Sequence, residues 1–214
     1  MATKFWFPNS GSAPMDTIAW SAYWDHVDNS HLHLPLLLAK SSVAHGYFSS
    51  GTYNYNPFGG MQFISPQMAA YSWTTADEIK LQCGLFGDTN SITYLSAAIR
   101  VVSGDGATVR GTLWQGHSIS AANGNRSLGG SGAHVHVAGS VAQQAGDRIV
   151  VELGVEWVAS TGTGTYTITG DDNASDYPED DTDTSWTKNP WVEFSPTIAD
   201  YSGGTNVALT GVSG

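Results

Sequence analysis

Apolar and polar side chains alternate along much of this chain, and the alternation is clearest between residues 149 and 157. In that segment every second position from Val151 onward is apolar, and the opposite face carries Glu152 and Glu156. A period of two is typical of an antiparallel strand with one buried and one solvated face. We therefore predict a strand over 149–157 whose apolar face packs in a core and whose two glutamates face solvent or a neighbouring molecule. The apolar face consists of Val151, Leu153, Val155 and Trp157.

Two other segments with strand character are separated by a short turn. Residues 92–103 and 108–114 flank the Gly-Asp-Gly sequence at 104–106, and such an arrangement predicts a hairpin. Shorter alternating segments predict further strands over 78–86, 133–140, 165–169 and 191–194. The segment 165–169 follows 149–157 after a Gly- and Thr-rich turn, so we predict that these two strands pair with each other.

The predicted elements are nearly all strands, which sets the expected fold class. The first 75 residues are less regular, and residues 17–27 fit either a helical turn or a strand. Polar loops are expected within 116–132 and 171–188. We predict an all-β chain with long loops: one antiparallel β-sandwich domain over residues 1–198, which opens on an aromatic segment, and a C-terminal extension over residues 199–214.

The charge balance narrows the classes of partner. The chain has 214 residues, with 19 Asp and Glu against 8 Lys and Arg, a formal net charge of −11, and its basic residues are scattered. Nucleic-acid binding and attraction to anionic lipid both need clustered cations, so we expect neither partner. The opening segment is too short for the apolar region of a signal peptide, and no apolar run has the length of a membrane span. We therefore expect a protein made in the cytoplasm, whose single cysteine, Cys83, is a small core residue.

An acidic loop is the strongest charge feature of the sequence. Carboxylate oxygens at this density are the ligands that Ca²⁺ prefers, although the loop lacks the glycine and the final glutamate of an EF-hand. A solvated loop without a metal is the alternative that we favour. The candidate ligands are Asp171, Asp172, Asp176, Asp180, Asp181 and Asp183.

Two His-x-His pairs, His31 with His33 and His134 with His136, form a second metal candidate. On a strand, the two imidazoles of each pair lie on one face, about 7 Å apart. The sequence offers no identifiable third ligand. The alternatives are histidines on a polar strand face, which we favour, and contact with symmetry mates across the axis of a homotrimer. We predict no bound metal and no cofactor.

Tryptophans raise the question of sugar binding. Trp186 and Trp191 flank residues 188–190 beside the acidic loop, and an exposed indole pair offers flat faces on which sugars stack. Sequence signatures of hydrolases, nucleotide-binding enzymes and zinc proteases are absent. Glu152 and Glu156 are about 13 Å apart on a strand, which exceeds the separation of about 5–9.5 Å that glycosidases use. We therefore predict a protein that is not an enzyme.

Three segments resemble putative structural proteins of tailed bacteriophages: residues 95–113, 145–154 and 189–195, the last with the sequence Asn-Pro-Trp-Val-Glu-Phe-Ser. The resemblance implies a jelly-roll-like sandwich on the exterior of a virion, either as a capsid decoration or as a tail-associated protein, with no catalytic residues. The alternative is an adhesion module that binds host surface glycan and resembles a carbohydrate-binding domain.

The two ends of the chain are more apolar than solvated termini usually are. Exposed apolar clusters of this kind mark contact surfaces. We therefore expect the chain to form a homo-oligomer, with a trimer favoured, or to dock onto other virion proteins. The candidate assembly residues are Phe5, Trp6, Phe7, Val207, Leu209 and Val212.

Overall fold

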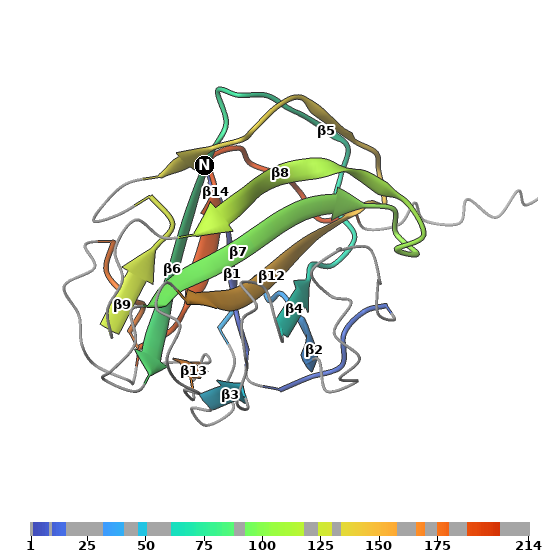
Figure 1. Cartoon of the computed structure of the whole chain (residues 1–214). Helices are drawn as coiled ribbons and strands as arrows, with labels where there is room; N and C mark the ends of the chain where they lie inside the picture. Colours follow the sequence, from blue (N-terminus) through green and yellow to red (C-terminus); the bar gives the residue numbers. More distant parts are fainter. Residues whose placement is uncertain are drawn as a thin grey trace, which may run out of the picture.

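The computed structural model describes eleven parts of the chain, and within them every regular element is a strand (Figure 1). The predicted all-β fold class is confirmed for this part of the chain. Membrane-spanning helices are absent from it. The described residues are 2–8, 10–15, 32–40, 47–50, 61–87, 93–117, 124–129, 134–157, 166–169, 175–179 and 188–201.

A five-stranded sheet is built around the predicted strand at 149–157. That strand, β12 (Arg148–Trp157), pairs over its whole length with β7 (Thr93–Val102), and β8 (Val109–His117) continues the sheet beyond β7. On its other side β12 pairs with β4 (Met61–Ile64), which pairs in turn with β2 (Leu32–Pro35). The β2–β4 pair is parallel, so the sheet is not antiparallel throughout as predicted.

The predicted hairpin is confirmed as β7 and β8. Its turn is closed by the Ser103 amide, which donates to the Thr108 carbonyl, and by the Ser103 hydroxyl, which donates to Asp105 Oδ1 at 2.6 Å. Gly106 has a φ of 75°, a backbone conformation that residues with a Cβ adopt at a cost. The Gly-Asp-Gly sequence therefore supplies both the side-chain acceptor and the left-handed residue that this turn needs.

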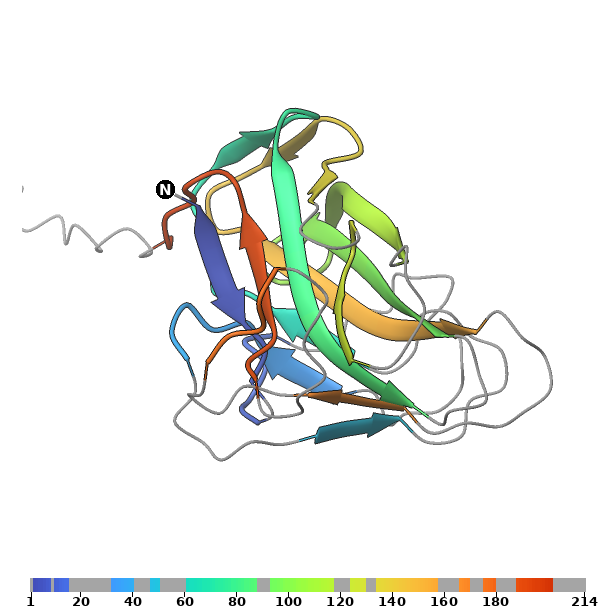
Figure 2. The ribbon, with the colours of Figure 1, turned by 90° about the vertical axis from the view of Figure 1, so that its left-hand side faces the viewer.

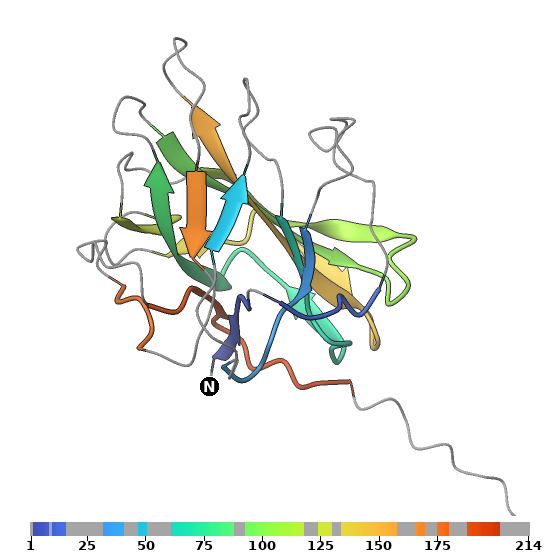
Figure 3. The same cartoon turned by 90° about the horizontal axis from the view of Figure 1, so that it is seen from below.

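A seven-stranded sheet is organised around the long strand β6 (Glu78–Gly87), and Figure 2 shows β1 (Thr3–Trp6), β14 (Trp191–Phe194) and β6 side by side. The strand β13 (Tyr166–Thr169) pairs with β6 and with β3 (Tyr47–Ser50), and β13 and β3 lie together in Figure 3. The predicted pairing of 165–169 with 149–157 is therefore wrong. The last two members of this sheet are β9 (Gly124–Ser127) and β10 (Val135–His136), which both pair with β6.

A third, two-stranded sheet consists of β5 (Tyr71–Trp73) and β11 (Val141–Gln143). Its presence means that the single sandwich of the sequence-based prediction is not confirmed, and the jelly-roll-like topology stays a prediction. One hydrophobic cluster nevertheless takes side chains from all three sheets. Examples are Leu81 and Val192 from the seven-stranded sheet, Ile99 and Val151 from the five-stranded sheet, and Trp73 from β5. The three sheets therefore share a core.

The central strand β12 is buried on both faces, which corrects part of its prediction. Leu153 is 1% exposed and Val151 is fully buried, as predicted, but Glu152 is also only 1% exposed. The Glu152 carboxylate accepts a hydrogen bond from Arg100 Nη1 at 2.8 Å and another from Gln62 Nε2 at 2.9 Å. Burial of a carboxylate is tolerated where a cation and further donors satisfy it. The side chains of residues 155–157 lie outside the described residues.

The two ends of the described chain are joined in one sheet. Strands β1 and β14 pair antiparallel, the Thr3 hydroxyl donates to the Pro196 carbonyl at 2.9 Å, and the Ile198 amide donates to the Thr3 hydroxyl at 2.7 Å. Phe5 packs edge-on against Phe194, with ring centroids 6.2 Å apart. The first strand is therefore part of the core, and nothing in the described residues tests the proposed boundary at residue 198.

Candidate metal centre

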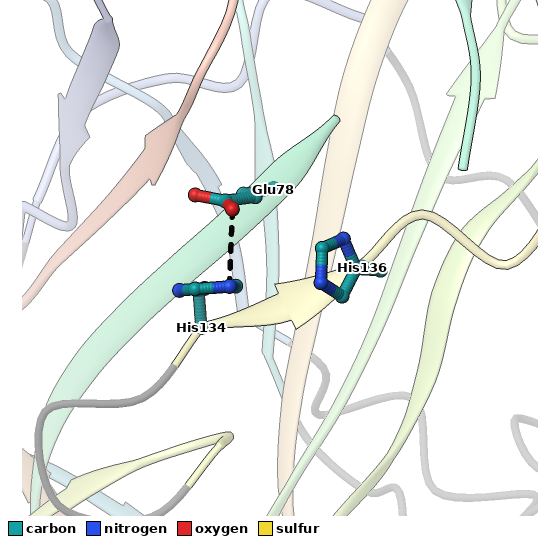
Figure 4. Close-up of side chains that lie close together, drawn as sticks. All are labelled: Glu78, His134 and His136. Atoms are coloured by element: carbon teal, nitrogen blue, oxygen red, sulfur yellow. Dashed lines mark ion pairs between the residues drawn. The ribbon is translucent and has the colours of Figure 1, made fainter. Parts of the chain in front are cut away.

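Three side chains that can bind a metal ion meet on the surface of the seven-stranded sheet. In the antiparallel pairing of β10 with β6, His136 lies opposite Glu78. His134 is two residues before His136, so its side chain projects on the same side of the extended segment. His134 Nε2 lies 3.0 Å from Glu78 Oε1, and Figure 4 shows both imidazoles beside the carboxylate.

The geometry of this Glu78–His134–His136 cluster is close to that of a coordination site. One ligand atom from each residue can be chosen so that all three lie within 4.8 Å of one another. The two imidazole rings are 5.1 Å apart between centroids and nearly perpendicular, at 87°. Glu78 is half-buried and both histidines are exposed. In the described part of the chain, this is the one group of three or more His, Cys, Asp or Glu side chains that meets this criterion.

Backbone hydrogen bonds hold the cluster in place from both strands. The Glu78 amide donates to the Ser195 hydroxyl at 2.9 Å, and the Val137 amide donates to the Asp77 carbonyl at 3.0 Å. Glu78 also lines a small open hollow of about 190 Å³, together with Ala2, Lys80, Glu193 and Ser195. The ligand residues therefore stand on a fixed sheet, while their side chains face solvent.

The sequence identified two of these three residues. The spacing of His134 and His136 predicted that their imidazoles share a face, but the third ligand, Glu78, lies far away along the chain. Only the register of β10 on β6 brings it opposite His136, and no local pattern encodes that register. In the other pair, His33 lies on β2 and belongs to no such cluster among the described residues, and His31 lies outside them.

Asp176 of the predicted acidic loop is held by cations of the chain itself. Its carboxylate contacts Lys4 Nζ at 2.8 Å and Lys40 Nζ at 2.9 Å, and it accepts a hydrogen bond from Trp6 Nε1 at 3.0 Å. Burial by itself raises the pKa of Asp176, but the hydrogen bonds from Lys4, Lys40 and Trp6 outweigh it, so the pKa lies below its ordinary value. Asp176 therefore anchors the loop instead of offering a free ligand. The other candidates, Asp171, Asp172, Asp180, Asp181 and Asp183, lie outside the described residues.

Trp191, a candidate for an exposed sugar-binding pair with Trp186, is buried in the fold. It is 2% exposed, its Nε1 donates to the Tyr177 carbonyl at 2.8 Å, and Lys4 Nζ lies 4.0 Å from the centroid of its ring. These contacts cover both its polar edge and one of its faces. Trp186 lies outside the described residues, so no described feature favours the glycan-binding alternative.

The N-terminal assembly residues are largely internal, which corrects their predicted role. Phe5 and Phe7 are fully buried, and the Phe7 ring lies 4.7 Å from that of Phe63. Trp6 is half-buried and hydrogen-bonded to Asp176. Folding of a single chain therefore already covers these aromatic rings. The C-terminal candidates Val207, Leu209 and Val212 lie outside the described residues.

Comparisons with known proteins give distant likenesses only. No protein-family model and no curated protein matches the chain. A solved structure of a CocE/NonD family hydrolase from Staphylococcus aureus is similar over 91% of this chain and 36% of its own, with 9% identity and a TM-score of 0.46. The infectious bursal disease virus Gt strain structure is similar over 75% of this chain and 37% of its own, with 13% identity and a TM-score of 0.31. The VP2 subviral particle of the same virus is similar over 77% of this chain and 40% of the VP2 chain, with 12% identity and a TM-score of 0.20.

The chain therefore spans between a third and two fifths of the length of these solved chains. The prediction that the chain is not an enzyme is corrected, because the first match is to a hydrolase. At a TM-score of 0.46 this likeness assigns no activity to the chain, and the viral structures, at 0.31 and 0.20, assign no assembly to it.

Proposed function

We propose that this chain is a structural protein on the exterior of a virus particle, specifically of a tailed bacteriophage. The observation that carries the proposal is where the three resembling segments lie in the fold. Residues 95–113 include most of β7 and the first part of β8, 145–154 include the turn into β12 and most of that strand, and 189–195 include β14. The resemblance to phage structural proteins is thus concentrated in framework strands of both large sheets.

Many residues of the three resembling segments are buried, which supports a resemblance in fold rather than in surface composition. Ile99, Val101 and Leu113 from the first segment are buried, as are Val151 from the second and Val192 from the third. Buried positions of a sheet constrain the sequence through packing, since volume changes in a filled core are costly. The three resembling segments therefore contain core positions, where a common fold would constrain the sequence.

Assembly into a homotrimer, or docking onto another virion protein, belongs to the same proposal. Closed symmetric homo-oligomers are the commonest assemblies of identical chains, and threefold positions are frequent on virion surfaces. Because Phe5 and Phe7 are internal, the candidate contact residues that remain are the apolar C-terminal residues Val207, Leu209 and Val212. Head and tail locations fit the proposal equally.

The location is tested on particles of the virus that encodes the chain. Particles are purified by density gradient, analysed by mass spectrometry and labelled with antibody to the folded protein for electron microscopy. The proposal requires the chain to be present in the particles and the label to lie on their surface. Particles that contain no copy of the chain, or that bind antibody only after disruption, would refute an exterior structural role.

The oligomer is tested on the purified protein by light scattering. A trimer has three times the 22.6 kDa mass of one chain. Leu209→Asp combined with Val212→Asp is expected to lower the mass to that of one chain, and Val109→Asp on the exposed part of β8 serves as the control. A wild-type mass of one chain excludes the homo-oligomer, and an unchanged mass in the double variant excludes the C-terminal contact.

A further inference from the structure

We propose that Glu78, His134 and His136 bind a divalent transition-metal ion, with Zn²⁺ as the best fit, at one site per chain. The proposal is independent of the virion role and extends to any setting in which the chain is folded. It rests on the convergence of three ligand side chains from two strands within 4.8 Å of one another (Figure 4).

The kinds of ligand select the kind of metal. Two imidazole nitrogens and one carboxylate oxygen are typical Zn²⁺ ligands, and they also suit Cu²⁺ and Ni²⁺. Ca²⁺ and Mg²⁺ require mostly oxygen ligands, of which this cluster has a single carboxylate. Zn²⁺ is the natural choice because it accepts three protein ligands and leaves a fourth position to water. Both histidines are exposed, so that water has direct access.

The distances need only side-chain adjustment to reach coordination. Ligand atoms about 2.1 Å from a tetrahedral Zn²⁺ are about 3.4 Å from one another. His134 Nε2 and Glu78 Oε1 are 3.0 Å apart, and no pair in the chosen set exceeds 4.8 Å. The backbone of the two strands is fixed by their register, with His136 opposite Glu78. The proposal therefore requires rotation of the exposed imidazoles and no change in the register of the two strands.

A metal at this position would add a cross-link between a short strand and its neighbour. Strand β10 has only two residues, and it pairs with β6 through Val135 opposite Ile79 and His136 opposite Glu78. Two of the three ligands belong to the β10 segment and the third to β6, so the ion joins them by a cross-link outside the backbone ladder. Because the site exists only in the folded chain, binding stabilises the fold.

The test uses the full chain, stripped of metal with a chelator and then titrated with Zn²⁺ by calorimetry. Co²⁺ provides a spectroscopic probe, because tetrahedral Co²⁺ absorbs visible light far more strongly than the hydrated ion. The expected results are one ion per chain, a tetrahedral Co²⁺ spectrum and a rise in melting temperature with Zn²⁺. His136→Ala and Glu78→Gln should each weaken Zn²⁺ binding by about tenfold or more and abolish the Co²⁺ spectrum.

His117→Ala is the matched control, because His117 is an exposed histidine on β8, in the other large sheet. It should bind Zn²⁺ as the wild type does. The metal-free melting temperature of each variant shows whether the variant folds. His136→Ala decides the test if Glu78→Gln is unstable, since the His136 side chain is exposed. The proposal is overturned if Zn²⁺ does not bind, if His117→Ala weakens binding as much as His136→Ala, or if each ion requires two chains.

Discussion

At the scale of single residues, the interior of this protein contains charge that its apolar periodicity does not reveal. Arg100 and Glu152 lie on neighbouring strands of the five-stranded sheet and form an ion pair at 2.8 Å. Gln62 donates to the carboxylate, and Arg100 Nη2 donates to Gln115 at 3.0 Å. This polar row crosses four strands of the sheet. Its members support one another, so removing one of them leaves the others short of partners.

The ion pair makes a first prediction. Arg100→Met should lower the free energy of unfolding by about 3–5 kcal/mol, because it leaves the Glu152 carboxylate buried without its cation. The double variant Arg100→Met with Glu152→Met should be more stable than Arg100→Met alone. Lys80→Met, which removes an exposed ion pair with Glu179, is the control and should cost only about 0–1 kcal/mol. Urea unfolding measures all of them, and a double variant less stable than Arg100→Met contradicts the prediction.

Apolar packing of β12 makes a second prediction. Leu153→Ala should lower the free energy of unfolding by about 2–5 kcal/mol, because Leu153 is buried in the shared core and its loss leaves a cavity. Val109→Ala, at a side chain that is 40% exposed, should change it by less than about 0.5 kcal/mol. Chemical denaturation of both variants checks the contrast, and similar costs for the two would place Leu153 outside the core.

Asp176 makes a third prediction, on pH. Its folded-state pKa lies below the value of the unfolded chain, about 3.9, so its stabilising effect is complete well above that pH and is lost as the pH falls through the folded-state pKa. Asp176→Asn should therefore be less stable than the wild type at pH 7, and the difference should shrink towards pH 3. Urea unfolding across this range tests it. A difference that is constant with pH would mean that the carboxylate charge is not responsible.

At the scale of elements, local turns determine where some strands begin and end, whereas long-range pairing determines which strands are neighbours. The turn before β12 is closed by Asp147, whose carboxylate accepts from the Gln144 amide at 2.8 Å and pairs with Arg110 at 3.1 Å. Gly146 in the same turn has a φ of 88°. This turn is readable in the sequence because Gly146 and the hydrogen bonds between Gln144 and Asp147 are local, whereas its ion pair with Arg110 is not. The short strand β10 lies within the predicted strand 133–140, but no local signal indicates its pairing with β6.

The turn makes a fourth prediction, with a control in the same part of the chain. Gly146→Ala should lower the free energy of unfolding by about 1–2 kcal/mol, because a side chain at positive φ is strained. Gly139→Ala should cost less, since its φ is ordinary and an added Cβ there would meet no atom within 4 Å. Thermal and denaturant unfolding compare the two. Equal costs would show that the backbone conformation at Gly146 does not limit substitution.

At the scale of the whole molecule, a core shared by three sheets implies cooperative unfolding of the framework. Cys83 lies in this core on β6, and burial raises the pKa of its thiol, which disfavours the reactive thiolate. A thiol reagent should therefore leave Cys83 unmodified in the native protein and modify it fully in denaturant. Ser72→Cys, at an exposed position on β5, should react at once. Rapid modification of native Cys83 would show that the core opens locally.

The sequence by itself determined which residues form the main strands and which side chains share a face. The strands β12, β6 and β14 and the β7–β8 hairpin follow from a period of two and from turn residues, both of which act over a few positions. It also identified His134 and His136 as a pair, and Cys83 as a core residue.

Only the tertiary structure decided what lies beside each strand and what covers each face. The partners of β13, the burial of Glu152, the anchoring of Asp176 by Lys4 and Lys40, and the third member of the metal cluster all depend on contacts between distant segments. An alternating pattern states that two sides of a strand differ in polarity, and it carries no information about which strand supplies the neighbour. Glu78 joins His134 and His136, and Arg100 neutralises Glu152, because strand register across the sheets is chosen by the packing of the whole core.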